Sequence, residues 1–452
     1  MLFLLVIGVG AADSRDLRDV PFYGVAGHFL HTRQIYPDKD DSWLISNTEP
    51  TRAELGAPWV AEQIYALTGK NRALVNDGTA NNADKFRIEQ RRALVDKWLD
   101  TYDAQDVQVL LTIIGAGPKA RNAKGINEDF ANWIAELVGR HRSIKVVQLH
   151  NEPNLRSFWA GTPADYVDTY RSIAHKIKHR NPNVIIAVGA ISSLSWGPGR
   201  LWLKEAIKDG LLDYADAISV HPYNLTAEPE VDPHTKYSLR DSFREFWAEI
   251  QAASPAGKQL RLYLTEFGYS SAIGGQASIG SEELQANYLA RLMLLYADFR
   301  VKENVPIDAV FWYDLKNDGR NKSEQEHNFG LVSADLKRKK PAFYTYQRII
   351  QALPDIGVLK SEDTDFSTNA DNIVVLSWVR PTGEKIIAAW QTGIQREGVH
   401  VEIKLPADES SKTANFLNLV TGEQTQRPLG QLAGQGTIII KDLRDVTLLT
   451  LR

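Results

Sequence analysis

The sequence predicts an α/β fold, with a (β/α)8 barrel over residues 20–353 and an antiparallel β-sandwich domain over residues 354–452. Two observations lead to this fold class. Up to residue 353, short apolar runs alternate with longer stretches whose apolar residues recur three and four positions apart, which is the pattern of strands alternating with helices. Beyond it the helical period disappears, and short β-rich runs follow one another between turns.

The first part of the chain contains eight apolar runs of strand length, at residues 22–29, 59–66, 107–114, 145–152, 184–191, 217–223, 260–267 and 309–315. Helical patterns between them cover residues 85–102, 129–141, 164–179, 201–208, 239–252 and 282–302. Strands that alternate with helices form right-handed βαβ units in a parallel sheet. Eight units favour a closed barrel, because a doubly wound sheet would normally have fewer strands and a glycine-rich first turn, which is missing here.

Residues 68–83 contain turn-forming residues and are expected to form an elaborated loop after the second strand. In the β-rich part, strands are expected at residues 373–379, 385–389, 399–405, 414–417, 437–440 and 446–451. Residues 362–372 have an acidic spacing that faintly resembles a calcium loop, but the central Gly and the final Glu are missing. We expect a solvated linker there.

Composition excludes several classes of protein. The 452 residues include 52 Lys and Arg against 56 Asp and Glu, a net charge of −4, and without a basic footprint no nucleic-acid partner is expected. An apolar fraction of 43% with 24% charged residues is typical of a folded, soluble enzyme. The absence of Cys excludes disulfides, zinc–thiolate sites, iron–sulfur clusters and a Cys nucleophile.

Residues 1–12 are expected to be a secretory signal peptide. An apolar run of about 11 residues ends in small residues and is followed by a polar stretch, which is typical of the end of such a signal. The run is shorter than the roughly 20 residues of a membrane-spanning helix. No Lys or Arg precedes it, so the signal would be truncated, and a buried strand or helix is the alternative. We therefore expect an exported protein, periplasmic or secreted, without a transmembrane span.

Two predicted strands end in a glutamate. The fourth reads KVVQLHNEPN and ends in Asn151 and Glu152, and the seventh reads LRLYLTEFGYSS and ends in Glu266. Barrel active sites lie at the C-terminal ends of the strands, and strands four and seven lie on roughly opposite sides. Two carboxylates facing each other across a cleft are what glycoside hydrolysis requires. A single Glu here would more often be an ion-pair partner or a helix N-cap.

The NEP motif at residues 151–153 and the TEFG motif at residues 265–268 resemble those of the retaining glycoside hydrolases of clan A. The resemblance is best to glycoside hydrolase family 39 and to the bacterial exopolysaccharide hydrolases associated with biofilm operons. Further matching segments are GAPWVAEQIYA, HPYN, FWYDLKNDG, HNFGLV and KPAFYTYQ. The resemblance covers nearly the whole barrel and implies that Glu152 is the acid/base and Glu266 the nucleophile, with no metal or organic cofactor.

Other residues at strand ends are candidate substrate contacts. The resemblance implies that Asn151 binds the sugar 2-hydroxyl. His221 and Tyr223 are two positions apart, so they share one face of strand six, where Tyr223 is placed to donate to Glu266. His28 ends the first strand and is a candidate sugar contact, although a structural histidine is equally compatible with such a position.

On strand eight, Trp312 is expected to form the floor of the subsite for the reacting sugar, with Asp314 on the same face. If the alternation is read one residue off, Phe311 and Tyr313 line the site instead. Trp159, Trp196, Trp202 and Tyr269 lie in or beside loops at the same rim, as sugar platforms or as core residues.

Strand two departs from the clan. Members commonly carry an Arg in a context like W-V-R-D-E that helps to keep the nucleophile ionised, whereas this sequence reads WVAEQ at residues 59–63. The supporting role of the Arg is therefore unassigned. Glu62 is expected to be a substrate contact, with a structural carboxylate as the alternative.

The sequence thus predicts a retaining endo-β-glycosidase, active as a monomer on a polysaccharide such as a bacterial exopolysaccharide. An exo-acting, β-xylosidase-like enzyme is the first alternative. A carbohydrate-binding barrel without activity is the second, since the Arg of strand two is missing. Zinc proteolysis, ordinary serine esterase chemistry and nucleotide hydrolysis lack their motifs.

Overall fold

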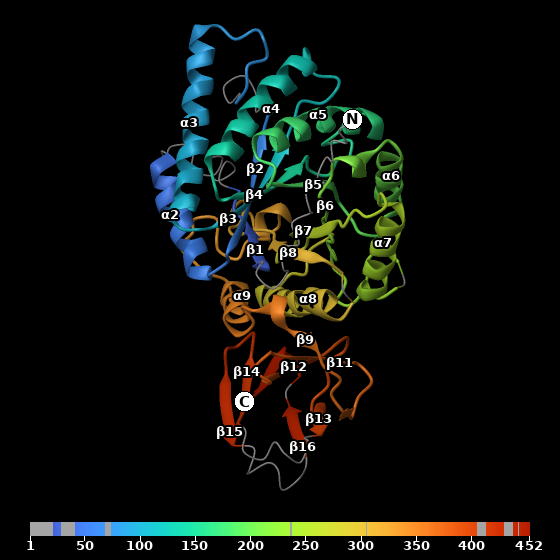
Figure 1. The fold of residues 1–452 in the computed structure, drawn as a ribbon. Helices are drawn as coiled ribbons and strands as arrows, with labels where there is room; N and C mark the ends of the chain where they lie inside the picture. Colours follow the sequence, from blue (N-terminus) through green and yellow to red (C-terminus); the bar gives the residue numbers. More distant parts are fainter. Residues whose placement is uncertain are drawn as a thin grey trace, which may run out of the picture.

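The fold is described from a computed structural model, which covers residues 21–28, 41–67, 74–235, 237–303, 305–404, 413–428, 437–441 and 443–452. The expected signal peptide, residues 1–12, lies outside the described residues, and so do positions 68–73 of the expected loop after strand two. The fold class agrees with the prediction: a parallel barrel is followed by antiparallel sheets (Figure 1).

Within the described ranges, eight parallel strands form a closed barrel in sequence order, and the last strand pairs with the first. They are β1 (Tyr23–Ala26), β2 (Trp59–Tyr65), β3 (Gln108–Ile114), β4 (Ile144–Leu149), β5 (Ile185–Ile191), β6 (Ala217–Val220), β7 (Arg261–Phe267) and β8 (Ile307–Trp312). Each predicted run overlaps one of these strands. However, β4 and β6 end three residues earlier than predicted, so Glu152 and Tyr223 lie in loops.

Helices surround the barrel (Figure 1). They are α2 (Asp41–Leu55), α3 (Asn82–Ala104), α4 (Ala123–Arg140), α5 (Pro163–Arg180), α6 (Gly197–Lys208), α7 (Leu239–Ala253), α8 (Glu282–Lys302) and α9 (Pro341–Ala352), with 3-10 turns η2 (Leu211–Asp213), η3 (Glu326–Asn328) and η4 (Ile356–Val358). Capping boxes at Asn81 and Thr162 begin α3 and α5. The sequence did not predict α2, which contains Pro50, or α9.

The barrel interior is filled by alternate residues of the strands. Trp59 and Ala61 of β2 meet Ala309 and Phe311 of β8 in one apolar cluster, and β1 contributes Gly24 beside the Phe311 ring. Because side chains alternate along a strand, the next inward positions are Gln63 on β2 and Tyr313 after β8. This register decides which residues reach the cleft above the barrel.

Two antiparallel sheets follow the barrel. Of the residues described beyond 353, β10, β13 and β16 form one sheet, and the order β15-β14-β17-β12-β11-β9 forms the other. Their bounds are β9 (Lys360–Ser361), β10 (Phe366–Thr368), β11 (Ile373–Val379), β12 (Lys385–Gln391), β13 (His400–Lys404), β14 (Thr413–Asn418), β15 (Gln424–Pro428), β16 (Thr437–Lys441) and β17 (Thr447–Leu451). Residues of both sheets share one apolar core, as in a sandwich.

The prediction of a solvated linker at residues 362–372 is partly wrong, because Phe366–Thr368 form β10 and pair with β13. All three residues of β10 are exposed, so no apolar alternation marks the strand in the sequence.

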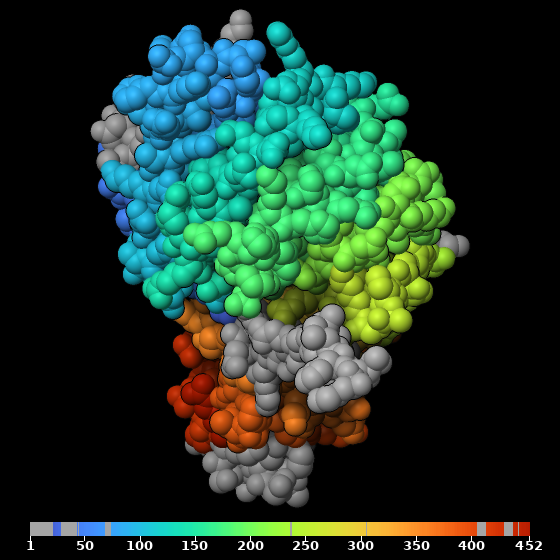
Figure 2. All heavy atoms as spheres, turned by 45° about the horizontal axis from the view of Figure 1, so that its top comes forward, coloured from blue at the N-terminus to red at the C-terminus, as the bar shows by residue number. Residues whose placement is uncertain are grey.

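The β-rich domain packs against α8 through β9 and against α9 through Arg348, which donates to the carbonyls of Leu419 and Val420. Figure 2 shows the domain in orange and red beneath the blue-to-yellow barrel. Every residue of α8 from Gln285 to Arg300 is buried, because the helix lies between the barrel and this domain. Trp378 and Trp390 of the sheets belong to the same apolar core as the barrel helices. Among the described helices, none is long and apolar enough to cross a membrane.

We expect Gly24→Ala to destabilise the barrel, because the added methyl would lie 2.6 Å from the Phe311 ring and 3.0 Å from Trp59. Overpacking of this kind costs about 1–3 kcal/mol in the free energy of unfolding, which denaturant titration measures. Gly197→Ala is the control, since a methyl there meets nothing within 4 Å. Equal stability of the two variants would contradict the packing described for the barrel interior.

Candidate active site

A cavity of about 500 Å³ lies at the C-terminal ends of the barrel strands. Strand ends supply most of its polar and aromatic lining, which includes His28, Gln63, Tyr65, Asn151, Glu152, Tyr223, Glu266 and Tyr313. The predicted catalytic pair therefore lies in one cavity, at the end of the barrel where such enzymes have their active sites.

Glu152 and Glu266 converge on one imidazole. The Nδ1 atom of His221 lies 3.0 Å from Oε1 of Glu152 and 3.5 Å from Oε2 of Glu266. One carboxylate oxygen of each Glu lies within 4.8 Å of the other. The imidazole is fully buried, and the two carboxylate side chains are 14% and 12% exposed, so both carboxylates face the cavity but are largely withdrawn from water.

Glu152 reaches this position through the backbone of the loop after β4. Its φ of +41° is in the left-handed region that few non-glycine residues adopt, and its N–H donates to the Ala190 carbonyl at 3.0 Å. Ala190, in β5, also has a positive φ, of +43°. Backbone strain of this kind is concentrated at functional sites.

Two further side chains hold Glu266. On strand two, the amide Nε2 of Gln63 donates to Oε1 of Glu266 at 3.1 Å, and the hydroxyl of Tyr65 donates to Gln63 Oε1 at 3.1 Å. Tyr223 donates to Oε2 of Glu266 at 3.5 Å, as the sequence predicted. Gln63 thus offers a neutral donor to Glu266, although the Arg position of the clan motif is occupied by Ala61.

Gln63 was not predicted as a site residue from the sequence. The signal that was available is its distance from Trp59: the two are four residues apart and lie on the same face of β2, so an inward Trp59 places Gln63 in the cavity. The same alternation turns Glu62 outward.

Glu62 lies outside the cavity, contrary to its expected role as a substrate contact. Its Oε1 accepts hydrogen bonds from Tyr102 at 2.7 Å and from Trp98 at 3.3 Å, and both donors belong to α3. Glu62 is 5% exposed and joins the barrel to that helix. It therefore has the alternative role, that of a structural carboxylate.

Trp312 is also not where the sequence analysis placed it. Its ring is fully buried and packs edge-on against Phe267 at a centroid distance of 5.9 Å, on the outer face of the barrel. Tyr313 lines the cavity instead, because Phe311 and Tyr313 are the inward residues of this run. The alternative register of this strand is therefore the observed one, and Tyr313 rather than Trp312 is the candidate for the subsite floor.

Asp314 reaches the site through His28 rather than directly. Its Oδ2 lies 3.3 Å from Nδ1 of His28, which lines the cavity, and both side chains are nearly fully buried. Burial opposes the charge of His28, but Asp314, together with the charges of Asp318 and Glu266, raises the pKa of the imidazole to about 9. His28 thus presents a paired, positively charged ring to the cavity.

The electrostatics of Glu266 and His221 are linked. Burial raises the pKa of Glu266, His221 lowers it, and the nearby charge of Glu152 raises it again. Burial opposes the charge of His221, whereas Glu266 and Glu152 raise the pKa of this imidazole. The groups therefore titrate as one unit, in which the imidazolium favours the ionised form of Glu266 and burial disfavours it.

Asn151 lines the cavity and is 5% exposed, and its Oδ1 has no hydrogen-bond partner among the described residues. A buried acceptor without a partner is costly, and a hydroxyl of a bound ligand would satisfy it.

The rim aromatics divide into two groups. Trp159 and Tyr269 are buried, and the Tyr269 hydroxyl donates to the Ala227 carbonyl at 2.7 Å, so they pack as core residues. Phe158, which the sequence analysis did not single out, lines the cavity and is 40% exposed. Such an aromatic face suits stacking on the apolar face of a sugar.

Among the residues that the structure describes, three groups of His and acidic side chains bring possible metal ligands within 4.8 Å of one another: His28 with Asp314 and Asp318, Glu152 with His221 and Glu266, and Asp100 with Asp103 and His141. Histidine–carboxylate pairing accounts for each group.

A family model described as cellulase (glycosyl hydrolase family 5) matches residues 71–313. Among solved structures, the chain is similar to a family 39 glycoside hydrolase from the gut symbiont Bacteroides cellulosilyticus WH2, with a TM-score of 0.69 and 19% identity over 96% of this chain and 82% of the other. No curated protein matches the chain.

Two further structures share the fold. A monomeric β-xylosidase from Caulobacter crescentus CB15 has a TM-score of 0.58 and 16% identity, over 96% of this chain and 97% of the other. An endo-β-1,6-glucanase has a TM-score of 0.55 and 10% identity, over 95% and 91%. At these identities the likeness is one of fold.

We expect His221→Asn to raise the pKa at which Glu266 loses its proton, because the variant removes the positive charge that favours the carboxylate while burial continues to disfavour it. Titration of side-chain carboxyl signals by ¹³C NMR measures the change. His141→Asn is the control, since His141 pairs with Asp96 and Asp103 away from the cavity. A downward shift in His221→Asn would show that the imidazole does not stabilise the charged Glu266.

Proposed function

We propose that this chain, which belongs to the cellulase family (glycosyl hydrolase family 5) of clan A, is a retaining endo-β-glycosidase that acts on a bacterial exopolysaccharide. As a glycoside hydrolase, it has a carbohydrate substrate. The exopolysaccharide part of the proposal is supported by the resemblance of the NEP and TEFG motifs and their companion segments. We further propose that the enzyme is exported, to the periplasm or the medium, and acts as a monomer.

The spacing of the two glutamates supports the proposed retaining mechanism. Glu152 and Glu266 present carboxylate oxygens within 4.8 Å of each other. Retaining enzymes separate their carboxyl groups by roughly 5–5.5 Å, whereas inverting enzymes need about 6.5–9.5 Å to admit a water molecule. The short spacing favours direct attack by one carboxylate on the anomeric carbon.

In the first step, an ionised Glu266 oxygen forms a bond to the anomeric carbon while the glycosidic C–O bond breaks and the leaving oxygen takes the proton of Glu152. Gln63 and Tyr223 donate to Glu266 and so hold the attacking carboxylate in place. Asn151, whose Oδ1 is buried and free of partners in the described structure, is positioned to accept from a hydroxyl of the reacting sugar.

In the second step, Glu152 accepts a proton from water, and the resulting hydroxide oxygen bonds to the anomeric carbon as the ester bond to Glu266 breaks. The covalent intermediate removes the negative charge of Glu266. Glu152, which has given its proton to the leaving oxygen in the first step, is then available as the base of the second step.

The apolar rim supports cleavage within a chain rather than at its end. Phe158 and Leu225 line the cavity and are 40% and 38% exposed, and such surfaces give sugar rings beyond the reacting unit something to stack on. An exo-acting, β-xylosidase-like enzyme is the alternative, and it would release single sugars.

We expect Glu152→Gln and Glu266→Gln each to lower kcat on the cleaved polysaccharide by at least about 10³-fold, because each removes one of the two groups that the mechanism requires. Release of new reducing ends from β-glucans, xylan, mannan and bacterial exopolysaccharides measures activity, and ¹H NMR of the first product gives its anomeric configuration. Oligosaccharides with retained configuration are the expected result.

Single sugars as the only product would favour the exo-acting alternative, and an inverted product would contradict the double displacement. Glu62→Gln is the matched control, because this Glu lies on the same barrel but faces α3. Binding without hydrolysis on every polymer would favour the carbohydrate-binding alternative.

The charge of the cavity leads to an expectation about the substrate. Among the described lining residues are Glu152, Glu266 and Glu326, whereas none is Lys or Arg, and the positive charge of His28 is paired with Asp314. Glu326 is an exposed residue of the lining, and its partial desolvation together with the charges of Asp318, Glu266 and Glu152 raises its pKa. A sugar that carries a carboxylate would add to this negative charge, so we propose that the polysaccharide is neutral or carries amino groups.

We expect the cleaved polymer to be hydrolysed about tenfold faster in kcat/KM than its carboxymethylated derivative, because one like-charge contact costs on the order of 1 kcal/mol or more in a partly desolvated cleft. Glu326→Gln should reduce this ratio. Glu324→Gln is the control, since Glu324 is exposed and outside the cavity lining. A preference for the carboxymethylated form would contradict the proposal.

A further inference from the structure

The loop between β6 and α7 carries Tyr223 into the cavity, and its own side chains fold it. Asn224 is 1% exposed, and its Nδ2 donates to the Val231 carbonyl at 2.8 Å and to the carbonyls of Glu228 and Pro229 at 3.4 Å. Because the residue next to Tyr223 binds the far side of the loop, a movement of residues 228–231 would be passed to Tyr223.

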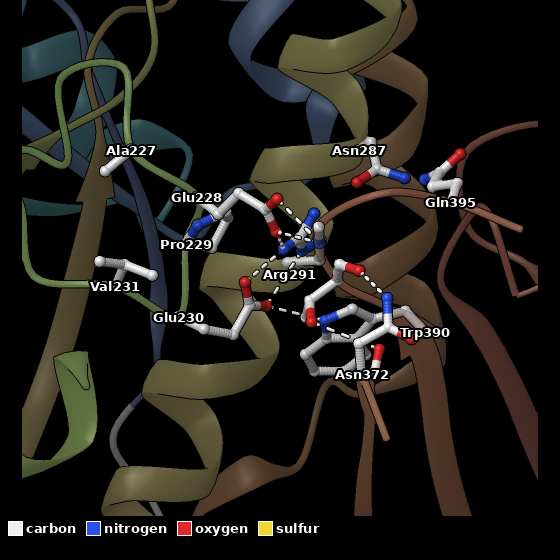
Figure 3. Close-up of polar contacts among 12 residues, drawn as sticks. Ala227, Glu228, Pro229, Glu230, Val231, Asn287, Arg291, Asn372, Trp390 and Gln395 are labelled. Atoms are coloured by element: carbon white, nitrogen blue, oxygen red, sulfur yellow. Dashed lines mark hydrogen bonds and ion pairs between the residues drawn. The ribbon is translucent and has the colours of Figure 1, made fainter. Parts of the chain in front are cut away.

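The far side of this loop is anchored by Arg291 of α8 (Figure 3). Arg291 is 3% exposed and pairs with both Glu228 and Glu230, and its Nε donates to Oε1 of Glu230 at 3.0 Å. Burial opposes the charge of Arg291, whereas Glu230 and Glu228 raise the pKa of the guanidinium. A buried guanidinium is stable only when such partners satisfy its charge and its donors.

The β-rich domain completes the same cluster. Trp390 of β12 donates its indole N–H to Oε1 of Glu230 at 2.7 Å, and the backbone N–H of Gly393 donates to the two oxygens of Glu228 at 2.8 and 3.0 Å. Figure 3 shows that Trp390 and Arg291 both approach the Glu230 carboxylate. Both loop carboxylates are therefore held between α8 and the second domain.

We propose that Arg291 and Trp390 are positioning residues for catalysis, which hold Glu228 and Glu230 so that the Tyr223 hydroxyl stays within reach of Glu266. The β-rich domain is then part of the active-site scaffold as well as a packing partner of the barrel. The inference rests on the proposed function, because it assigns Glu266 a catalytic role. The chain of contacts runs from Trp390 through Glu230 and the Asn224-folded loop to Tyr223.

The structure offers a matched pair of variants. Trp390→Phe keeps an aromatic ring and removes the indole donor to Glu230. Trp378→Phe likewise keeps a ring and removes an indole donor. Trp378 is another fully buried Trp of this domain, and its indole donates at 3.1 Å to Asp298 of α8. Both variants remove one hydrogen bond across the same interface, but only Glu230 belongs to the loop that carries Tyr223.

The first measurement is amide hydrogen exchange of residues 224–231, which needs no substrate. We expect Trp390→Phe to exchange about tenfold faster there than wild type, and Trp378→Phe to match wild type in this loop. The expected tenfold corresponds to the loss of roughly one net hydrogen bond. Unchanged exchange in Trp390→Phe, or an equal increase in both variants, would overturn the proposal.

The second measurement is a double-mutant cycle on the cleaved polysaccharide. We expect Trp390→Phe to lower kcat by about fivefold with little change in KM, less than the loss of a whole hydrogen bond to a charged group. In a Tyr223→Phe background the same substitution should have little further effect, because the two act through one contact. Additive losses would show that Trp390 does not act through Tyr223.

The two readouts separate the two proposals. If the wild type hydrolyses no polymer, the proposed function fails, and hydrogen exchange still decides whether Trp390 holds the loop. If the wild type is active and Trp390→Phe behaves as Trp378→Phe, only the positioning role fails. Should Trp390→Phe not fold, Glu228→Gln weakens the same cluster at its contact with Gly393 and serves in both measurements.

Discussion

The active site depends on one buried imidazole that serves two carboxylates. His221 is fully buried and lies 3.0 Å from Glu152 and 3.5 Å from Glu266. In a site withdrawn from water, charges at these distances interact far more strongly than on the surface, and two ionised glutamates so close together would repel each other. The shared imidazole offsets part of this repulsion, and so allows the carboxylates to stand at the short spacing that a double displacement needs.

The neighbouring contacts follow from the same constraint. Gln63 and Tyr223 give Glu266 neutral donors, and His28 adds a positive charge that its own partner, Asp314, sustains. A site that relies on neutral donors and on an imidazole, rather than on an Arg against the nucleophile, stays sensitive to the geometry of each donor. This sensitivity is why the placement of Tyr223 matters.

The sequence could predict the barrel and the catalytic pair because both depend on strong local patterns. Apolar runs of strand length are visible one by one, and a glutamate at the end of such a run stands out. The register of β8 was not predictable in the same way, because Phe311, Trp312 and Tyr313 are all aromatic and β8 is buried on both faces. Only the packing of Phe311 in the barrel interior shows that Tyr313, and not Trp312, reaches the cavity.

Contacts between distant parts of the chain could not be predicted from the sequence, for a related reason. Glu228 and Glu230 lie in a loop whose polar sequence is typical of a solvent-exposed segment. Their partner Arg291 is separated from them by about sixty residues. Trp390 was recognisable as a core residue, but nothing in its sequence context indicates that its N–H meets a loop of the barrel. The strands thus place the carboxylates, the loops place their donors, and the second domain restrains one of those loops. Because a few directional contacts join the strands to the loops and the loops to the second domain, the catalytic geometry depends on the whole chain rather than on the barrel alone.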